Sequence, residues 1–187
     1  MKILTLIYDG FTEYEYTFVV HALAGAGLEV DVVGAEGKVV RGHFGLEVTA
    51  PRTLSEVKET EGYDALFLPG LRKDARGITN NTEIHNLIRS MNMSGKIIAA
   101  VCGAPMFLTK AGVLKGRYFT STIKDHPSFR GARRVDDLVA RNNNLITGQD
   151  RGFITFTALF LEALGHSIAA HNLLEYYMIP KEMGRHS

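Results

Sequence analysis

Residues 96–105 read KIIAAVCGAP, and this stretch decides the predicted fold. The apolar run that begins at Ile97 predicts a strand buried on both faces, as in a parallel sheet covered by helices. Small residues on either side of Cys102 permit a sharp turn, and Pro105 suits the first turn of a helix, where its missing N–H costs nothing. The pattern predicts a nucleophile elbow that presents the Cys102 side chain at the end of a strand.

Strand and helix patterns alternate on both sides of this elbow. Residues 3–8, 28–34 and 63–68 are predicted strands, and residues 14–26, a segment capped by Thr82, 106–112, 153–164 and 167–177 are predicted helices. The order strand, helix, strand within the first 34 residues is typical of a right-handed βαβ unit. We therefore expect an α/β fold with a mostly parallel central sheet.

Two hairpins are expected beside the parallel strands. Residues 39–40 and 46–48 flank a glycine-containing turn, which predicts a hairpin at the edge of the sheet. Residues 133–147 predict strand pairs around the triplet 142–144 (NNN), since asparagine tolerates the positive φ of a tight turn.

Length and composition exclude several classes of protein. The chain has 187 residues, which suits a single domain spanning 1–187, and 21 Lys+Arg against 20 Asp+Glu give a net charge of +1. Such a balance does not favour binding to nucleic acid or to an anionic membrane. The apolar run near the N-terminus is too short for a signal peptide or a membrane span, and a single cysteine excludes an intramolecular disulfide. We expect a cytoplasmic protein.

Cys102 is the candidate nucleophile. Free amides at the start of a helix favour a thiolate, so the elbow predicts a lowered pKa and a reactive sulfur. The alternative is that a lone cysteine after an apolar strand is a small buried hydrophobic residue. A proton partner could come from residues 10–15 (GFTEYE), where Glu13 and Glu15 follow the first strand. Both could instead simply favour a helix N-terminus.

Other candidates lie at the ends of neighbouring strands. The backbone N–H groups of Gly70, Leu71 and Gly103 could stabilise an oxyanion. His126, in the predicted loop at residues 121–127, is a candidate base, or else a solvated loop histidine. No pair of histidines has the spacing of metal ligands with carboxylates, so we expect no metal.

Four motifs in order resemble the ThiJ/PfpI superfamily, whose fold is class I glutamine amidotransferase-like. They are GFxxxE at 10–15, DALFLPG at 64–70, AAVCGAP at 99–105 and LITGQ at 145–149. The resemblance implies a flavodoxin-like three-layer sandwich and a homodimer, with no metal or organic cofactor. It also implies that Glu15, rather than Glu13, is hydrogen-bonded to the Cys102 thiol.

The sequence departs from that family at three positions. Gly103 stands where the peptidase-like branch has a histidine, which disfavours proteolysis. Thr122 occupies the position that provides a histidine or aromatic residue in the deglycase-like branch, and His126 comes four residues later. Leu71 replaces a glycine after the strand-end Leu-Pro-Gly, so its side chain should narrow the pocket.

Three functions follow from these residues. The first is an enzyme of the glyoxalase or deglycase type, in which the Cys102 thiolate attacks a small reactive carbonyl and Glu15 moves a proton. The second is a redox-sensing or chaperone-like stress protein that uses oxidation of Cys102. The third is an amidase or hydrolase, which needs a further acid. The expected partners are a small-molecule substrate and a second copy of the chain.

Overall fold

A seven-stranded sheet forms the centre of the protein. The computed structural model describes residues 1–71 and 73–178. The strand order is β10-β11-β7-β6-β1-β2-β5, and only β10 runs antiparallel to its neighbour. The strands are β1 (Lys2–Ile7), β2 (Glu29–Gly34), β5 (Arg52–Thr53), β6 (Ala65–Leu68), β7 (Ile97–Val101), β10 (Val139–Asn142) and β11 (Leu145–Gly148).

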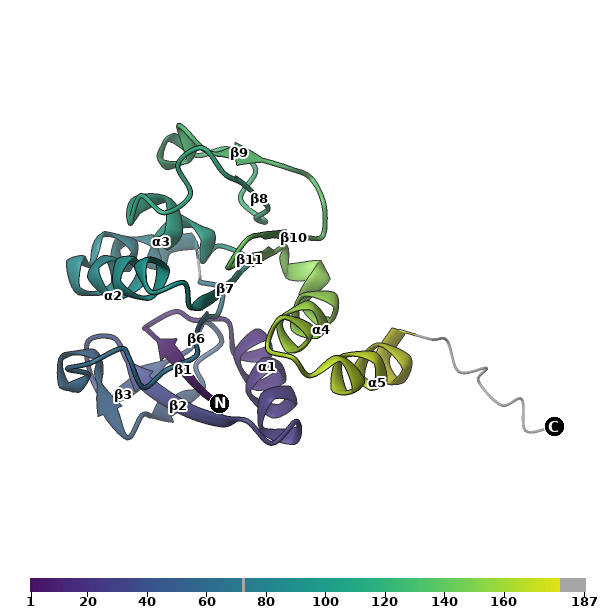
Figure 1. Ribbon diagram of the computed structural model, residues 1–187. Helices are drawn as coiled ribbons and strands as arrows, with labels where there is room; N and C mark the ends of the chain where they lie inside the picture. Colours follow the sequence, from purple (N-terminus) through teal and green to yellow (C-terminus); the bar gives the residue numbers. More distant parts are fainter. Residues whose placement is uncertain (72, 179–187) are drawn as a thin grey trace.

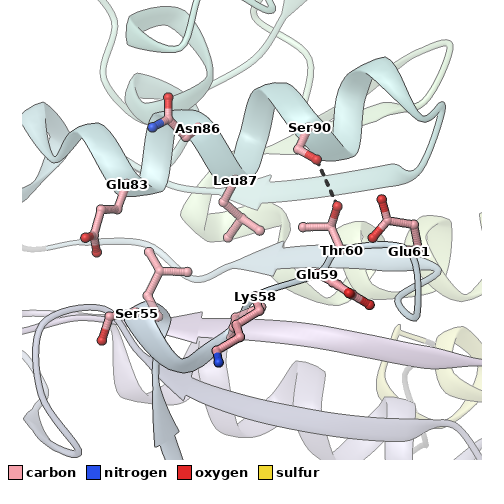
Figure 2. A pocket seen from close by; sticks show the side chains of 11 residues that line it. Ser55, Lys58, Glu59, Thr60, Glu61, Glu83, Asn86, Leu87 and Ser90 are labelled. Carbon is pink, nitrogen blue, oxygen red and sulfur yellow. Dashed lines mark hydrogen bonds between the residues drawn. The ribbon is translucent and has the colours of Figure 1, made fainter.

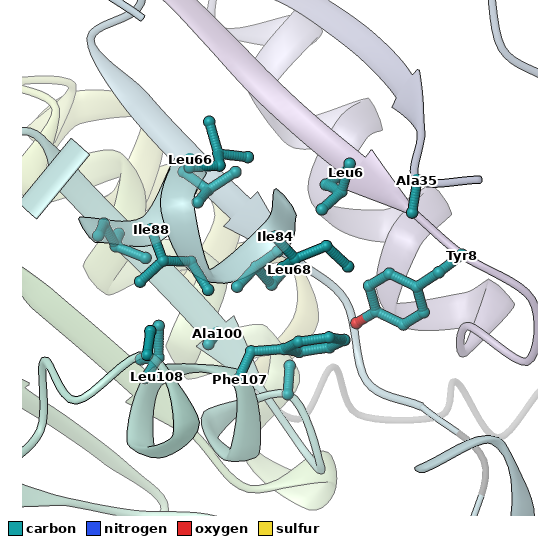
Figure 3. Close-up of a cluster of buried hydrophobic side chains, with 14 of the residues drawn as sticks. Leu6, Tyr8, Ala35, Leu66, Leu68, Ile84, Ile88, Ala100, Phe107 and Leu108 are labelled. Carbon is teal, nitrogen blue, oxygen red and sulfur yellow. The ribbon is translucent and has the colours of Figure 1, made fainter. Parts of the chain in front are cut away.

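Helices cover both faces of this sheet (Figure 1). On one face lie α2 (Thr82–Met93) and α3 (Pro105–Lys110), and on the other lie α1 (Glu13–Gly25), α4 (Phe153–Ala163) and α5 (Ser167–Met178). Buried side chains separate into two clusters, one on each face. In the first cluster, Ile84 and Ile88 of α2 lie beside Phe107 and Leu108 of α3 (Figure 3). This arrangement confirms the predicted three-layer α/β fold.

The two faces of each central strand supply different clusters. In β6, Leu66 belongs to the α2 and α3 side, whereas Ala65 and Phe67 belong to the side of α1, α4 and α5. Successive side chains of a strand point to opposite faces, so a strand covered on both faces must be apolar at every position. The uninterrupted apolar runs of the sequence have this physical cause.

The first predicted hairpin forms, but it does not join the central sheet. Strands β3 (Val39–Arg41) and β4 (Glu47–Thr49) pair only with each other, and β5 takes the edge position beside β2. A second small sheet pairs β8 (Tyr118–Phe119) with β9 (Arg133–Arg134). The expected hairpin around 142–144 is confirmed as β10 and β11, with Asn143 at φ 57° in its turn.

Helix α2 starts as expected, although its cap is a different residue. The side chain of Asn81, rather than that of Thr82, accepts hydrogen bonds from the N–H groups of Glu83 and Ile84. Asparagine at this position satisfies amides that have no partner within the helix. Within residues 1–71 and 73–178, no helix is both long and apolar enough to cross a membrane.

Candidate active site

Cys102 occupies the sharp turn between β7 and α3. Its φ is 60°, and the only other non-glycine residue with positive φ in the described part of the chain is Asn143. The Cys102 N–H donates to the carbonyl of Gly148 at the end of β11, at 2.8 Å. A non-glycine residue in this left-handed backbone region is strained, and such strain is characteristic of functional sites. The nucleophile elbow predicted from the sequence is therefore present.

Glu15 lies beside Cys102 with its side chain fully buried. It belongs to the first turn of α1, which follows β1 directly. Its Oε2 accepts a hydrogen bond from the Gly70 N–H at 2.8 Å, and its Oε1 is 3.4 Å from the Tyr14 hydroxyl. A hydrogen bond also links its carboxyl to the Cys102 side chain. Residues that follow β1, β6 and β7 thus meet at the carboxyl edge of the sheet, as expected for a parallel fold.

Glu13 faces a different part of the molecule. Its Oε1 accepts hydrogen bonds from the N–H groups of Phe44, at 2.5 Å, and Leu46, at 3.4 Å. These amides belong to the turn between β3 and β4. Glu13 therefore holds that hairpin against α1, and Glu15 is the carboxylate at the elbow.

The structure revises the expected oxyanion donors. The Gly70 N–H is already used by Glu15, so Gly70 positions the carboxylate instead of an oxyanion. The Gly103 N–H donates to the Cys102 sulfur. The Leu71 side chain packs on Gly103, since a Cβ added to that glycine would lie 3.0 Å from Leu71 Cδ2. Leu71 therefore lies directly against the residue that follows Cys102.

Burial raises the pKa of both acidic groups in the pair. Burial raises the pKa of Glu15 to about 7, and the nearby Asp150 charge adds to that rise, whereas the hydrogen bond from Gly70 opposes it. Burial and then the charge of Glu15 raise the pKa of the Cys102 thiol to about 12, against opposing hydrogen bonds from Thr122 and Gly103. The expectation of a lowered thiol pKa was therefore wrong, because desolvation outweighs the elbow amides.

The loop after β8 contributes Thr122 to the site. The Thr122 N–H donates to the Cys102 carbonyl at 3.1 Å, and its hydroxyl is a donor within reach of a Cys102 thiolate, which lowers the pKa of the thiol. His126 is used elsewhere, because its Nδ1 accepts from the Ser128 N–H at 3.1 Å and contacts the Ser128 hydroxyl at 2.7 Å. His126 thereby caps the short helix η3 (Pro127–Phe129). These hydrogen bonds assign His126 to the turn, and Thr122 is the loop residue at the sulfur.

Asp150 is the site residue that sequence reasoning missed. It begins the short helix η4 (Asp150–Gly152) just after β11, and its charge acts on both Glu15 and Cys102. It also exchanges two hydrogen bonds with Thr122. A signal was present, since Asp150 directly follows the motif at 145–149 and a strand end belongs to the binding edge of such sheets.

A hollow of about 450 Å³ lies elsewhere, between residues 54–61 and α2 (Figure 2). Glu83, Leu87 and Ser90 of α2 line one side, and the Ser90 hydroxyl is 2.8 Å from that of Thr60. Cys102 and Glu15 are not among the lining residues. Within the part of the chain that the structure describes, no three His, Cys, Asp or Glu side chains are grouped so that they could hold a metal ion.

Comparison with known proteins agrees with the observed fold. Residues 1–163 match the model of the DJ-1/PfpI family. The chain is 35% identical over 154 residues to Deglycase PfpI of Pyrococcus furiosus, covering 81% of this chain and 92% of the relative. It is 36% identical over 128 residues to Protein/nucleic acid deglycase 2 of Escherichia coli, covering 64% and 70%. The crystal structure of Drosophila melanogaster DJ-1beta superposes with a TM-score of 0.83 at 26% identity, covering 96% of this chain and 98% of that one. Because the family model matches residues 1–163, the chain belongs to the DJ-1/PfpI family.

Proposed function

We propose that this protein is a cysteine-dependent enzyme that acts on small reactive carbonyls, such as 2-oxoaldehydes. The observation that carries the proposal is the buried Glu15 carboxyl hydrogen-bonded to the Cys102 side chain, with a pKa of about 7. A group with a pKa near the working pH can both accept and return a proton. Relatives named as deglycases support a carbonyl compound as the substrate.

In the first step, the Glu15 carboxylate takes the thiol proton while the Cys102 sulfur attacks the aldehyde carbon. A C–S bond forms, the carbonyl π bond breaks, and the oxygen becomes an alkoxide that the protonated Glu15 neutralises. The product is a hemithioacetal. This order of events suits a thiol whose pKa is raised, because the proton leaves only as the sulfur begins to bond.

In the second step, Glu15 transfers a proton within the hemithioacetal. It removes a proton from the carbon bound to sulfur, giving an enediolate, and returns that proton to the neighbouring carbon, while the hydroxyl proton of the first carbon moves to the oxygen of the second. The first carbon is thereby oxidised to a thioester and the second is reduced to an alcohol. Water then hydrolyses the thioester, which releases a 2-hydroxy acid and restores the thiol. The net change is the addition of one water to the 2-oxoaldehyde.

The test is lactate formation from methylglyoxal by the wild type, Cys102→Ser and Glu15→Gln. Turnover in the wild type and its loss in both variants supports the proposal. Retention of turnover in Cys102→Ser overturns it, as does the lack of turnover in a folded wild type. Glu162→Gln, which changes an exposed glutamate of α4, is the matched control and should keep wild-type turnover.

A second candidate is a protein that senses oxidation at Cys102. Its support is the set of donors directed at the sulfur, which includes the Gly103 N–H and the Thr122 hydroxyl. These donors would stabilise the oxygen atoms of a sulfinate, and a protonated Glu15 would add a third hydrogen bond. This candidate gains support if peroxide gives a stable sulfinate while methylglyoxal is not consumed.

A further inference from the structure

Thr122 and Asp150 form a reciprocal pair next to the sulfur. The Thr122 hydroxyl donates to Asp150 Oδ1 at 3.1 Å, and the Asp150 N–H donates to Thr122 Oγ1 at 2.8 Å. The carboxylate has a second anchor, since the Arg151 N–H donates to Oδ1 at 2.7 Å. The Thr122 oxygen is therefore fixed in place, and only the direction of its O–H bond remains free.

The same hydroxyl also lies within reach of the Cys102 sulfur, where it favours the thiolate. The loop that carries it is tied to the elbow, because the Cys102 carbonyl accepts from the Thr122 N–H at 3.1 Å and from the Ser121 hydroxyl at 2.6 Å. A hydroxyl has one proton to donate. It can satisfy the Asp150 carboxylate or the Cys102 thiolate, but not both at once.

We propose that Asp150 is a positioning residue for Cys102. Its carboxylate competes with the Cys102 sulfur for the proton of the Thr122 hydroxyl, and so controls when that hydroxyl stabilises the thiolate. While Cys102 is a thiol, the hydroxyl points to Asp150. When the sulfur gains charge, the O–H bond rotates towards it. No covalent bond is made or broken in this change.

Other titratable groups also face Cys102, and their effects on the thiol differ from that of the Thr122 hydroxyl. Glu15 and Tyr14 come from α1, Tyr8 follows β1, and Asp150 follows β11. The Asp150 charge by itself also opposes a thiolate, whether or not Thr122 is present. Only the part of the Asp150 effect that requires the Thr122 hydroxyl belongs to the inference.

A double-mutant cycle separates the two effects, with iodoacetamide alkylation of Cys102 as the readout. Intact mass follows this reaction cleanly, because the chain has one cysteine and only the thiolate reacts. At pH 8, Thr122→Val should slow alkylation roughly tenfold, and Thr122→Ser should restore it to within about threefold. Asp150→Asn should speed alkylation roughly tenfold in the wild type but only about threefold in Thr122→Val.

Equal effects of Asp150→Asn in both backgrounds would show that Asp150 acts by charge alone, which overturns the inference. So would an unchanged rate in Thr122→Val. Asp125→Asn removes one negative charge from an exposed residue of the same loop and should leave the rate unchanged. If Thr122→Val does not show a cooperative thermal transition, Thr122→Ala takes its place with the same expected signs.

The inference rests on the proposed use of Cys102 as a nucleophile, but the alkylation cycle does not require turnover. If the cycle shows coupling while methylglyoxal is not consumed, the proposed function fails and the positioning role stands. If methylglyoxal is consumed without coupling, the positioning role fails and the proposed function stands.

Discussion

Gly70 lies so close to both Glu15 and Cys102 that residue 70 has no room for a side chain. A Cβ at residue 70 would be 2.2 Å from Glu15 Oε2 and 2.6 Å from Cys102 Cβ. The Gly70 N–H holds the same carboxylate oxygen at 2.8 Å. The backbone after β6 is therefore both the support for the carboxylate and the spacer that sets its distance from the sulfur.

Gly70→Ala should abolish methylglyoxal turnover, because the added methyl group must displace Glu15, Cys102 or the β6 turn. Overpacking of this kind costs about 1–3 kcal/mol of the free energy of unfolding. Urea unfolding and lactate formation check both effects. Gly62→Ala, at a glycine with no atom within 4 Å of the added Cβ, is the control. Wild-type turnover in Gly70→Ala would show that the spacing of Glu15 and Cys102 does not matter.

Glu15→Gln should stabilise the protein at alkaline pH. The pKa of Glu15 is about 7 in the folded state, against an ordinary value of 4.5, so the folded chain retains a proton that the unfolded chain loses. The free energy of unfolding of the wild type should therefore fall by about 3 kcal/mol as pH rises from 4.5 to above 7. The glutamine variant has no such proton and should lack this fall.

Urea unfolding of wild type and Glu15→Gln at pH 4.5 and pH 8 measures the difference. The two proteins should be similar at pH 4.5, where both carry a neutral group at residue 15, and the variant should be more stable at pH 8. Glu162→Gln should follow the wild type at both pH values. A parallel loss in wild type and Glu15→Gln would mean that another group causes the pH dependence.

Glu13→Leu should loosen the hairpin of β3 and β4 without changing the chemistry of Cys102. The change leaves the N–H groups of Phe44 and Leu46 without their acceptor, which lowers the free energy of unfolding by about 1–3 kcal/mol. Faster hydrogen exchange at the Phe44 amide is the expected sign, together with unchanged alkylation of Cys102. A large change in alkylation would place Glu13 at the site and contradict its role in the hairpin.

Much of the fold could be predicted because it depends on local patterns. Continuous apolar strands such as residues 97–101 indicate a sheet covered on both faces, and the small residues around Cys102 indicate the elbow. The separate sheet of β3 and β4 could not be predicted, because pairing partners depend on the position of β5 beside β2.

The site could be predicted only in part, for physical reasons. Glu15 and Glu13 are two residues apart, and only their different surroundings after folding separate their roles. The sign of the Cys102 pKa shift depends on how deeply the sulfur is buried and on the charge of Glu15, neither of which a motif records. Asp150 lies near the Cys102 sulfur because β11 pairs with β7, and these two strands are far apart in the sequence.

Oxidation of Cys102 by dilute peroxide should be slow near neutral pH and faster at higher pH. The thiolate is the species that reacts, and the raised pKa of the thiol keeps its population low. Intact-mass spectrometry should show added oxygen atoms instead of a covalent dimer, since the partly buried sulfur is shielded from a second chain. A disulfide-linked dimer as the main product would contradict the sheltered geometry.

The pH profile of turnover should reveal which group accepts the thiol proton. If the Glu15 carboxylate is that group, kcat/KM should rise about tenfold per pH unit below 7 and level off above it, because the pKa of Glu15 is about 7. Glu15→Gln should lose both turnover and this rising limb. Direct attack by a preformed thiolate would instead give a rate that continues to rise well above pH 9, since the pKa of Cys102 is raised to about 12. Steady-state kinetics with methylglyoxal between pH 5.5 and 9.5 separates the two profiles, and circular dichroism at each pH confirms that the protein remains folded. A plateau that begins near pH 7 would show that Glu15 accepts the thiol proton. A profile without a plateau would show that Glu15 is not the base.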